Sequence, residues 1–334
     1  MLLTARMIQD ACGELPFIFR AGAWKPRTSP YSFQGAGEEA LQWLVEVKKT
    51  LGIEVATEVA TAEHVRAALK AGIDYLWIGA RTSANPIAVQ AIADAIAECR
   101  LQRTDCRPKG VLVKNPVHDD CALWIGNIER IEKTGIPVMA VHRGCNHQPH
   151  WQMAHTLRNT RPDIPLLIDP SHMSGEATRV AGLVKQAALL EYNGAMIEVH
   201  PTPTRALSDA KQQITPSEVR ETLDPLATRY RLVSDFLTPC GDKQSAGTET
   251  ELTWLRAEID ELDEVLWQTI AKRMDVSRRI GEWKKEHHVA PLQPERYKEI
   301  VNKLKLKEEQ LGLPQEFMQQ LFDLIHEESL RQQK

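Results

Sequence analysis

Two stretches decide how this chain can fold: PLLIDPSHMSG at residues 165–175 and AMIEVHPTPTRALSDAKQQ at residues 195–213. In each, a short apolar run ends in polar residues, which are His172 after the first run and Glu198 and Asp209 after the second. In a parallel α/β protein, residues at the carboxyl ends of strands lie on the functional face. One imidazole and two carboxylates suit a divalent metal such as Mn2+, Fe2+, Co2+ or Zn2+. We therefore predict a metal site at these three residues; the alternative is that each is an ordinary polar loop residue.

The first 237 residues alternate between apolar runs and amphipathic segments. This alternation predicts a parallel sheet covered by helices, and at this length a (β/α)8 TIM barrel is favoured over an open, doubly wound sheet. The chain opens on a helix and shows seven strands against eight helical segments, so we expect the first barrel strand to be missing, through a shortened N-terminus or an incomplete barrel. The expected strands are 17–19, 53–56, 75–78, 110–113, 137–141, 165–168 and 195–197. The expected helices are 2–12, 37–50, 62–70, 86–100, 120–133, 147–159, 176–191 and 216–236.

Basic side chains recur just after the expected strands, at one edge of the expected sheet. Scattered lysines and arginines ordinarily reflect a solvated surface. Several at the same edge instead form a converging anion site, because both side chains bind phosphate and carboxylate through charge-assisted hydrogen bonds. We expect an anionic, phosphorylated substrate close to the metal. The residues concerned are Arg20, Lys25, Arg27, Arg81, Lys114 and Arg143.

The composition excludes several classes of protein. With 43% hydrophobic and 26% charged residues the chain is globular, and a net charge of −4 gives no global indication of nucleic-acid binding. No apolar run approaches the ~20 residues that cross a membrane, and the first residues lack the pattern of a signal peptide. The six cysteines show no metal-finger spacing. A reduced, cytoplasmic protein is therefore expected.

A second, all-helical domain is expected at residues 252–334, after a polar linker at 238–251 that lacks periodicity. Apolar residues at helical spacing predict one long helix of roughly 30 residues that begins at Leu252 and is interrupted only by Gly281 near its end. Two shorter helices are expected at 294–310 and 314–333, each with a proline near its start. A helix that long cannot bury its whole apolar stripe against two shorter ones, so we predict a homodimer through this domain.

The long expected helix carries cations whose faces can be compared by angle. At about 100° per residue, Arg273 and Lys284 fall within about 20° of each other, whereas Arg256 is about 100° away. Ser329 and Gln333, one turn apart on the last expected helix, share a face. A solvated charged helix would also explain these residues.

The ordered motifs KPRTSPYSFQG, IGAR, VKNP, HRG, IDPSH, EVHP and ALSD resemble those of the type I-beta 3-deoxy-7-phosphoheptulonate (DAHP) synthases over residues 17 to about 236. The resemblance implies a TIM barrel and a metal-dependent condensation of phosphoenolpyruvate with erythrose 4-phosphate, the entry to the shikimate pathway. It assigns the metal to His172, Glu198 and Asp209. It implies that phosphoenolpyruvate is held by Arg20, the catalytic Lys25, Arg81, Lys114 and Arg143, and that erythrose 4-phosphate meets Lys25, Arg27 and Thr28. The family's fourth ligand is a cysteine in a Gly-Pro-Cys motif that closes the first barrel strand, and this sequence has no such motif.

Residues 253 to 334 resemble the all-helical, AroQ-type chorismate mutases, through LRAEIDELDEVL, the cations that follow it and the final SLRQQ. The resemblance implies the rearrangement of chorismate to prephenate without covalent catalysis, and a counterpart of Arg256 that reaches into the partner's site. Gln293 and Tyr297 stand where that family commonly has acidic residues. The implied catalytic residues are Arg273, Lys284 and Gln333, and the implied substrate-binding residues are Arg256, Gln293, Arg296 and Ser329.

Together the two resemblances predict a cytoplasmic, bifunctional enzyme of aromatic amino-acid synthesis. Prephenate bound to the helical domain is expected to inhibit the barrel, because the fusion joins a first committed step to a branch point. Two alternatives stay open: a phosphoenolpyruvate-dependent synthase that uses another phosphosugar, and a barrel that has lost its first strand and only regulates or scaffolds the mutase.

Overall fold

The computed structural model describes residues 1–26, 29, 31–102, 107–227, 248–290, 293, 297, 299–301 and 312–333. It divides into two compact units, Met1–Glu258 and Ile259–Lys334. Helix α11 (Thr248–Glu286) begins in the first unit and continues into the second. No helix among the described residues combines the length and the apolar character needed to cross a membrane.

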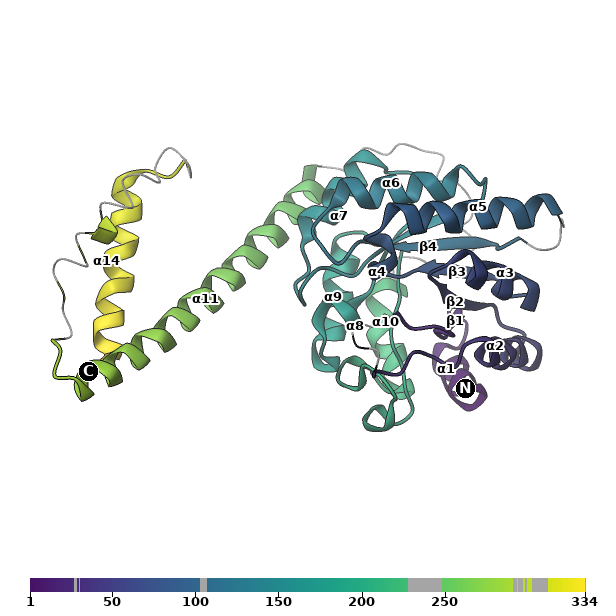
Figure 1. The fold of residues 1–334 in the computed structure, drawn as a ribbon, viewed down its shortest axis with the longest axis horizontal. Helices are drawn as coiled ribbons and strands as arrows, with labels where there is room; N and C mark the ends of the chain where they lie inside the picture. Colours follow the sequence, from purple (N-terminus) through teal and green to yellow (C-terminus); the bar gives the residue numbers. More distant parts are fainter. Residues whose placement is uncertain are drawn as a thin grey trace. The chain divides into compact units, whose positions relative to one another are not determined.

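The first unit is an alternation of parallel strands and helices, as the sequence predicts (Figure 1). Its strands are β1 (Phe19–Arg20), β2 (Val55–Val59), β3 (Tyr75–Ile78), β4 (Gly110–Lys114), β5 (Val138–His142), β6 (Leu166–Ile168) and β7 (Gly194–Ala195). Its α-helices before α11 are α1 (Leu2–Cys12), α2 (Glu38–Leu51), α3 (Ala62–Ala71), α4 (Ala80–Ser83), α5 (Pro86–Gln102), α6 (Cys121–Glu132), α7 (Trp151–Thr160), α8 (Pro170–Ser174), α9 (Ala177–Leu189) and α10 (Val219–Ala227).

The strands form one parallel sheet in the order of the chain, β1 to β7. Each strand pairs with the next, as in the register of Tyr75 with Gly110 and of Val111 with Val138. Such a sequential parallel sheet with helices between its strands is the architecture of a TIM barrel. The expected α/β fold with seven strands is therefore confirmed.

The sheet has two cores, which explains why its strands are apolar on both faces. On the inner side, Tyr75, Trp77, Leu112 and Met139 pack together within one buried cluster. The larger cluster lies between the sheet and the helices, and the helices contribute to it through one apolar stripe each, as Leu41, Leu44 and Val47 do for α2. Strand β4 is consequently buried at every position.

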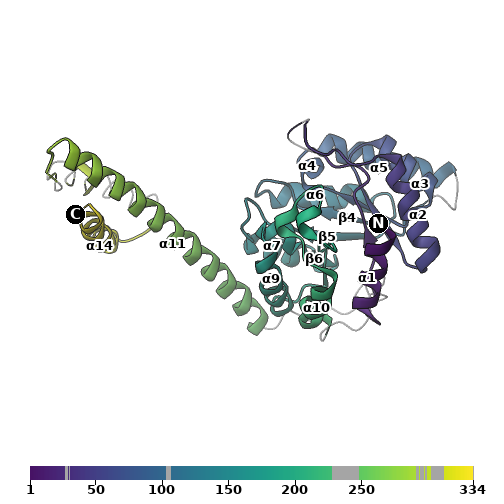
Figure 2. The same cartoon turned by 90° about the horizontal axis from the view of Figure 1, so that it is seen from below.

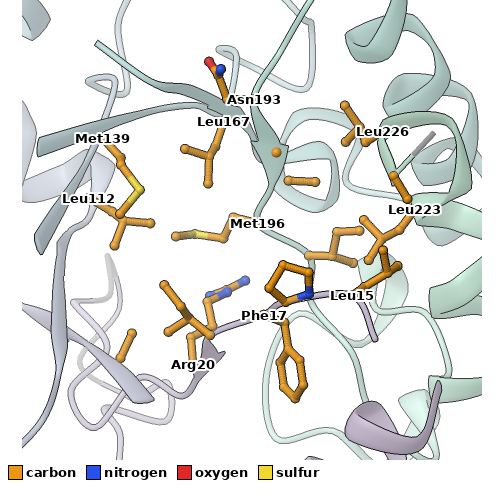
Figure 3. A pocket seen from close by; sticks show the side chains of 17 residues that line it. Leu15, Phe17, Arg20, Leu112, Met139, Leu167, Asn193, Met196, Leu223 and Leu226 are labelled. Carbon is orange, nitrogen blue, oxygen red and sulfur yellow. The ribbon is translucent and has the colours of Figure 1, made fainter. Parts of the chain in front are cut away.

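The barrel sheet is open between its first and last strands. Among the described residues no hydrogen-bonded pairing joins β1 to β7. Helices α1 and α10 lie next to each other at this side of the unit (Figure 2). An apolar pocket lies at this opening (Figure 3). Its lining includes Leu15, Phe17, Arg20, Leu112, Met139, Leu167, Met196, Leu223 and Leu226. The count of seven strands thus corresponds to a real opening in the sheet.

Several expected boundaries differ from the structure in an instructive way. The expected loops after β3 and β6 contain the short helices α4 and α8, which apolar periodicity cannot detect because each is shorter than two turns. The expected helix 216–236 begins as the 3-10 turn Pro216–Glu218 and continues as α10 to Ala227; its remainder lies outside the described residues. The Thr215 capping box explains the start of that turn.

In the second unit, α11 and α14 (Gln315–Gln332) pack together around the buried Met274, Met318 and Ser329. The helix expected at 294–310 lies largely outside the described residues. Gly281 does not interrupt α11. A Cβ atom there would lie 2.6 Å from the Cα of Gln333, so glycine allows the end of α14 to approach closely.

The second unit leaves much of its apolar surface exposed. Leu262, Trp267 and Leu324 are 61%, 63% and 66% exposed. Exposed apolar side chains of this size along one helical unit are typical of a surface that another protein covers.

Candidate functional site

One pocket of the first unit collects the predicted barrel residues. It lies at the carboxyl ends of the strands, where a TIM barrel carries its active site. The predicted residues that line it are Arg20, Lys25, Arg81, Lys114, Arg143, His172, Glu198 and Asp209. Arg27 and Thr28 lie outside the described residues. Cations outnumber carboxylates in the lining by five to three, with Glu58 counted among the carboxylates, so the pocket suits an anionic ligand.

Arg20 is the cation best placed to receive a ligand. Its guanidinium lies 5.4 Å from the ring centroid of Trp77, and its Nη2 is 3.6 Å from Oε1 of Glu198. Both Nε and Nη2 are buried, and neither has a hydrogen-bond partner in the part of the chain that the structure describes. A buried donor left unsatisfied is costly, so this guanidinium is prepared for an acceptor that a ligand supplies.

The loop after β1 places Lys25 through backbone hydrogen bonds. The Thr57 hydroxyl on β2 accepts from the Ala23 N–H (3.1 Å) and donates to the Ala21 carbonyl (3.0 Å). The Lys25 N–H donates to the Gln34 carbonyl, which closes the loop. The Lys25 ammonium then donates to the Ser208 hydroxyl (2.7 Å) and lies 3.9 Å from Asp209. The β1 loop and the loop after β7 therefore meet at this lysine.

Asp169 holds two predicted site residues at once. This buried carboxylate directly follows β6, accepts a hydrogen bond from the Lys114 ammonium at 2.5 Å and caps helix α8 by accepting the backbone N–H of His172. It also lies 3.1 Å from Nδ1 of His172. Burial opposes ionisation, but the charges of His172 and Lys114 prevail and hold the pKa of Asp169 well below its usual value. Asp169 thus fixes the imidazole so that Nε2 faces the pocket.

The three predicted metal ligands are only partly assembled. Nε2 of His172 lies 4.0 Å from Oε1 of Glu198, and Asp209 lines the same pocket beside Lys25. Burial opposes ionisation of Glu198, yet His172 and Arg20 lower its pKa, so the carboxylate is charged. Within the described ranges, no three such side chains are close enough together to hold a metal ion. The donor chemistry and the His172–Glu198 pair fit a divalent metal, and the remaining coordination is not formed.

Glu58 is a site residue that the sequence reasoning missed. It lies on β2, lines the pocket, and has its pKa raised by burial despite the opposing charges of Lys114 and Arg20. Gly79 makes room for it, because a Cβ there would lie 2.0 Å from Oε1 of Glu58. The sequence feature that could have indicated Glu58 is its position as an acidic residue inside the apolar strand VATEV.

The ends of β4 and β5 position two of the five cations. Lys114 is the last residue of β4, and Arg143 follows β5. The Asn115 side chain accepts the backbone N–H of Arg143 (2.7 Å) and donates to the Gly144 carbonyl (3.1 Å). Asn115 therefore ties the two strand ends together, and with them the two cations.

In the second unit, predicted mutase residues meet between α11 and α14. The Arg273 guanidinium donates to the Ser329 hydroxyl, and burial lowers the pKa of Arg273. The Lys284 ammonium donates to the Gln333 side-chain carbonyl at 3.1 Å. The face that the sequence predicted for Arg273 and Lys284 is thus the face that packs on α14.

The remaining predicted mutase residues are Gln293, Arg256 and Arg296. Gln293 is exposed, and Arg256 lies on the first turns of α11, in the first unit. Arg296 lies outside the described residues. Tyr297 donates its hydroxyl to the Asp323 carboxylate (2.6 Å), and this hydrogen bond is the main cause of its raised pKa.

The parallel barrel sheet brings five cations, three carboxylates and a histidine together at the carboxyl ends of its strands. The fold and the pocket therefore place this chain among TIM-barrel-like proteins that bind a small anion. The family follows from comparison with known proteins. The chain belongs to the DAHP synthetase I family, whose model matches residues 1–230. The model of chorismate mutase type II matches residues 255–334.

Individual relatives agree with this assignment. A phospho-2-dehydro-3-deoxyheptonate aldolase of Thermotoga maritima is 32% identical over 209 residues, which cover 59% of this chain and 56% of the relative. A 2-dehydro-3-deoxyphosphooctonate aldolase of Parasynechococcus marenigrum is 26% identical over 242 residues, 67% of this chain and 80% of the relative. The crystal structure of the Thermotoga maritima DAHP synthase superposes with a TM-score of 0.58 at 27% identity, covering 68% of this chain and 64% of that one. The chain therefore spans little more than half of the first of these relatives.

Proposed function

We propose that the chain is a bifunctional enzyme of the shikimate pathway. The barrel condenses phosphoenolpyruvate with erythrose 4-phosphate to 3-deoxy-7-phosphoheptulonate, and the helical unit rearranges chorismate to prephenate. The observation that carries the first activity is the convergence of five cations on the pocket that also contains His172 and Glu198. The second rests on the Arg273–Ser329 and Lys284–Gln333 pairs and on the family match.

In the barrel reaction, the cations hold the phosphate and carboxylate of phosphoenolpyruvate. The unsatisfied donors of Arg20, together with Lys114, Arg81 and Arg143, provide charge-assisted hydrogen bonds to both groups. Lys25, with Arg27 and Thr28 two and three residues further along the sequence, receives the sugar phosphate and brings its aldehyde against the enol. C3 of phosphoenolpyruvate then forms a bond to the aldehyde carbon, water adds at C2, and the phosphate leaves.

Protons move during this sequence, and Glu58 is suited to carry one. Its raised pKa brings its protonation equilibrium closer to neutral pH, and it faces the cations that hold the substrate. A divalent metal, one of Mn2+, Fe2+, Co2+ or Zn2+, would be held by His172 and Glu198 with Asp209 nearby, and when bound it supplies Lewis-acid polarisation of the aldehyde. Asp169 keeps the His172 imidazole turned toward that position.

The helical reaction needs positioning and charge rather than covalent chemistry. Arg273 and Lys284 bind the two carboxylates of chorismate and stabilise negative charge on the ether oxygen as its C–O bond breaks. Gln333 and Ser329 orient these two cations. The exposed apolar side chains of this unit support a homodimer that covers them. Leu262→Asp should convert the dimer to a monomer in analytical ultracentrifugation, because a charge is costly in an apolar interface.

The decisive experiment follows the loss of phosphoenolpyruvate absorbance with erythrose 4-phosphate, in Mn2+ and in EDTA, and the loss of chorismate on the same sample. We expect EDTA-sensitive condensation and metal-independent mutase activity. Mutase activity without condensation would refute the synthase half of the proposal. Saturating prephenate should lower the synthase rate, and unchanged synthase kinetics would refute feedback. A cytoplasmic location belongs to the same proposal.

Two specific observations favour other functions. Relatives such as the Parasynechococcus marenigrum protein carry the name 2-dehydro-3-deoxyphosphooctonate aldolase, which supports a five-carbon phosphosugar as the aldehyde. Measuring turnover with four- and five-carbon aldose phosphates shows which of these two sugars the enzyme uses. The opening between β1 and β7 supports a barrel that only scaffolds or regulates the mutase. A purified chain that retains stoichiometric metal would contradict that reading.

A further inference from the structure

A cluster of buried aromatic rings surrounds His142, and none of the roles above uses it. The rings of Trp124, Trp151 and Tyr192 have centroids 6.0, 5.9 and 6.2 Å from that of the imidazole, and each is at most 4% exposed. Nδ1 of His142 lies 2.7 Å from the Tyr192 hydroxyl oxygen. Burial is the main reason that the pKa of His142 falls to about 3, so the ring is neutral and Nδ1 can accept this hydrogen bond.

His142 connects the cluster to the substrate pocket through the backbone. It is the last residue of β5, and Arg143 of the pocket follows it directly. The His142 carbonyl accepts the backbone N–H of Asp169 (2.7 Å), and Asp169 in turn holds Lys114. A displacement of the imidazole therefore moves the backbone from which Arg143 projects, and it disturbs the carboxylate that fixes a second cation.

Trp254 closes the cluster at its other end. This residue of α11 belongs to the first unit, is 3% exposed and has its ring centroid 5.9 Å from that of Tyr192. It also stacks on His155 of α7 at 5.5 Å with an interplanar angle of 13°. One turn later Ala257 is equally buried. Trp254 immediately precedes the segment that matches chorismate mutase type II.

We propose that Trp254 is a positioning residue for the barrel site: it holds Tyr192, whose hydroxyl holds His142 and thereby sets the position of Arg143. The inference rests on the proposed binding of phosphoenolpyruvate by Arg143. It gives the first turns of α11 a role in the affinity of the barrel for its enol substrate. Simple core packing is the competing explanation, and it predicts a loss of stability without a specific loss of affinity.

The test measures phosphoenolpyruvate binding by isothermal titration calorimetry, with synthase KM and kcat and mutase activity on the same preparations. Trp254→Ala should weaken phosphoenolpyruvate binding and raise its KM about five- to tenfold, while kcat and the KM for erythrose 4-phosphate change less than about twofold. Trp254→Phe, which keeps an aromatic ring, should restore most of the affinity. Tyr192→Phe removes only the hydroxyl and should reproduce part of the loss.

A double-mutant cycle separates a shared mechanism from independent damage. If both residues act through His142, Trp254→Ala combined with Tyr192→Phe should bind little worse than Trp254→Ala alone. Ile92→Ala is the matched control, because Ile92 is fully buried on α5, outside the aromatic cluster. It should lower the unfolding temperature and leave the affinity for phosphoenolpyruvate unchanged.

Unchanged affinity in Trp254→Ala, an equal loss in Ile92→Ala, or additive losses in the double variant would overturn the inference. Binding is measured apart from turnover, so failures can be distinguished. A chain that binds phosphoenolpyruvate in a Trp254-dependent way but condenses nothing would contradict the proposed synthase and support the inference. A wild-type chain that does not bind phosphoenolpyruvate would overturn both.

Discussion

The two units of this chain hold their cations by different physical means. In the barrel unit, Lys114 and Arg143 project from strand ends whose positions are set by sheet hydrogen bonds, Asp169 and Asn115. In the helical unit, Arg273 and Lys284 depend on side chains of one neighbouring helix, while apolar residues such as Trp267 stay exposed. A site at the end of a buried sheet is therefore positioned largely within its unit, whereas a site on an open helix pair also depends on what covers its apolar face.

The largest expected effect tests whether the barrel site works separately from the helical one. His172→Ala removes the imidazole that Asp169 orients and should lower synthase kcat/KM at least about 100-fold. The reason is that losing a proposed ligand of the metal weakens the Lewis-acid stabilisation of the transition state by several kcal/mol. Mutase activity on the same sample should not change. His200→Ala is the control: His200 accepts the Thr202 N–H away from the pocket and should be neutral. A parallel loss of both activities would contradict the separation of the sites.

The reciprocal change addresses the helical unit. Arg273→Lys keeps the charge but loses the planar guanidinium, so mutase kcat/KM should fall about 100-fold with synthase activity intact. Arg278→Lys, at an exposed arginine that pairs with Asp275, should have little effect in the same chorismate assay. Equal losses in the two variants would mean that Arg273 contributes only general charge.

Burial in the barrel should also appear as a pH dependence of stability. The pKa of His142 is lowered to about 3, chiefly by burial, so between about pH 3 and pH 6.5 the unfolded chain binds a proton that the folded chain does not. Stability is then fully present above pH 6.5 and falls by about 1.4 kcal/mol per pH unit below it, or about 2 kcal/mol at pH 5.

His142→Asn should remove this contribution. Urea unfolding, followed by tryptophan fluorescence at pH 5 and pH 7, gives the free energy of unfolding at each pH. The difference between the two values should be smaller in the variant than in the wild type. The exposed His118 provides the comparison, since His118→Asn should leave the pH difference unchanged. If the free energy of unfolding depends on pH equally in the wild type and in His142→Asn, His142 is not the source of this pH dependence.

The smallest effect concerns the precision of the pocket. Gly79→Ala places a methyl group against Glu58, and because the carboxyl group must move, synthase kcat/KM should fall about tenfold, or about 1.4 kcal/mol. Gly182→Ala on α9 meets nothing within 4 Å and should leave activity unchanged while adding up to about 1 kcal/mol of helix stability. Full activity in Gly79→Ala would show that the position of Glu58 does not matter to the reaction.

The sequence alone determined the order of the barrel elements and most of the charged residues that line the candidate pocket. Strand alternation is visible because buried strands need continuous apolar runs, and the ends of all seven strands lie within three residues of the expected positions. The cations and the acidic and imidazole groups after these runs could be named because parallel strands end at one edge. The helical face of Arg273 and Lys284 followed from the 3.6-residue period of a helix.

Only the tertiary structure decided which of these groups have partners. Glu58 belongs to the site because the β3 end approaches β2 at Gly79, and Asp169 holds Lys114 because β4 and β6 face one pocket; both contacts join residues far apart in the chain. The close approach of α14 at Gly281, which sequence reasoning treated as an interruption, is of the same kind. Local patterns record what each element needs to bury, whereas pairing across elements depends on packing distances that no single segment encodes.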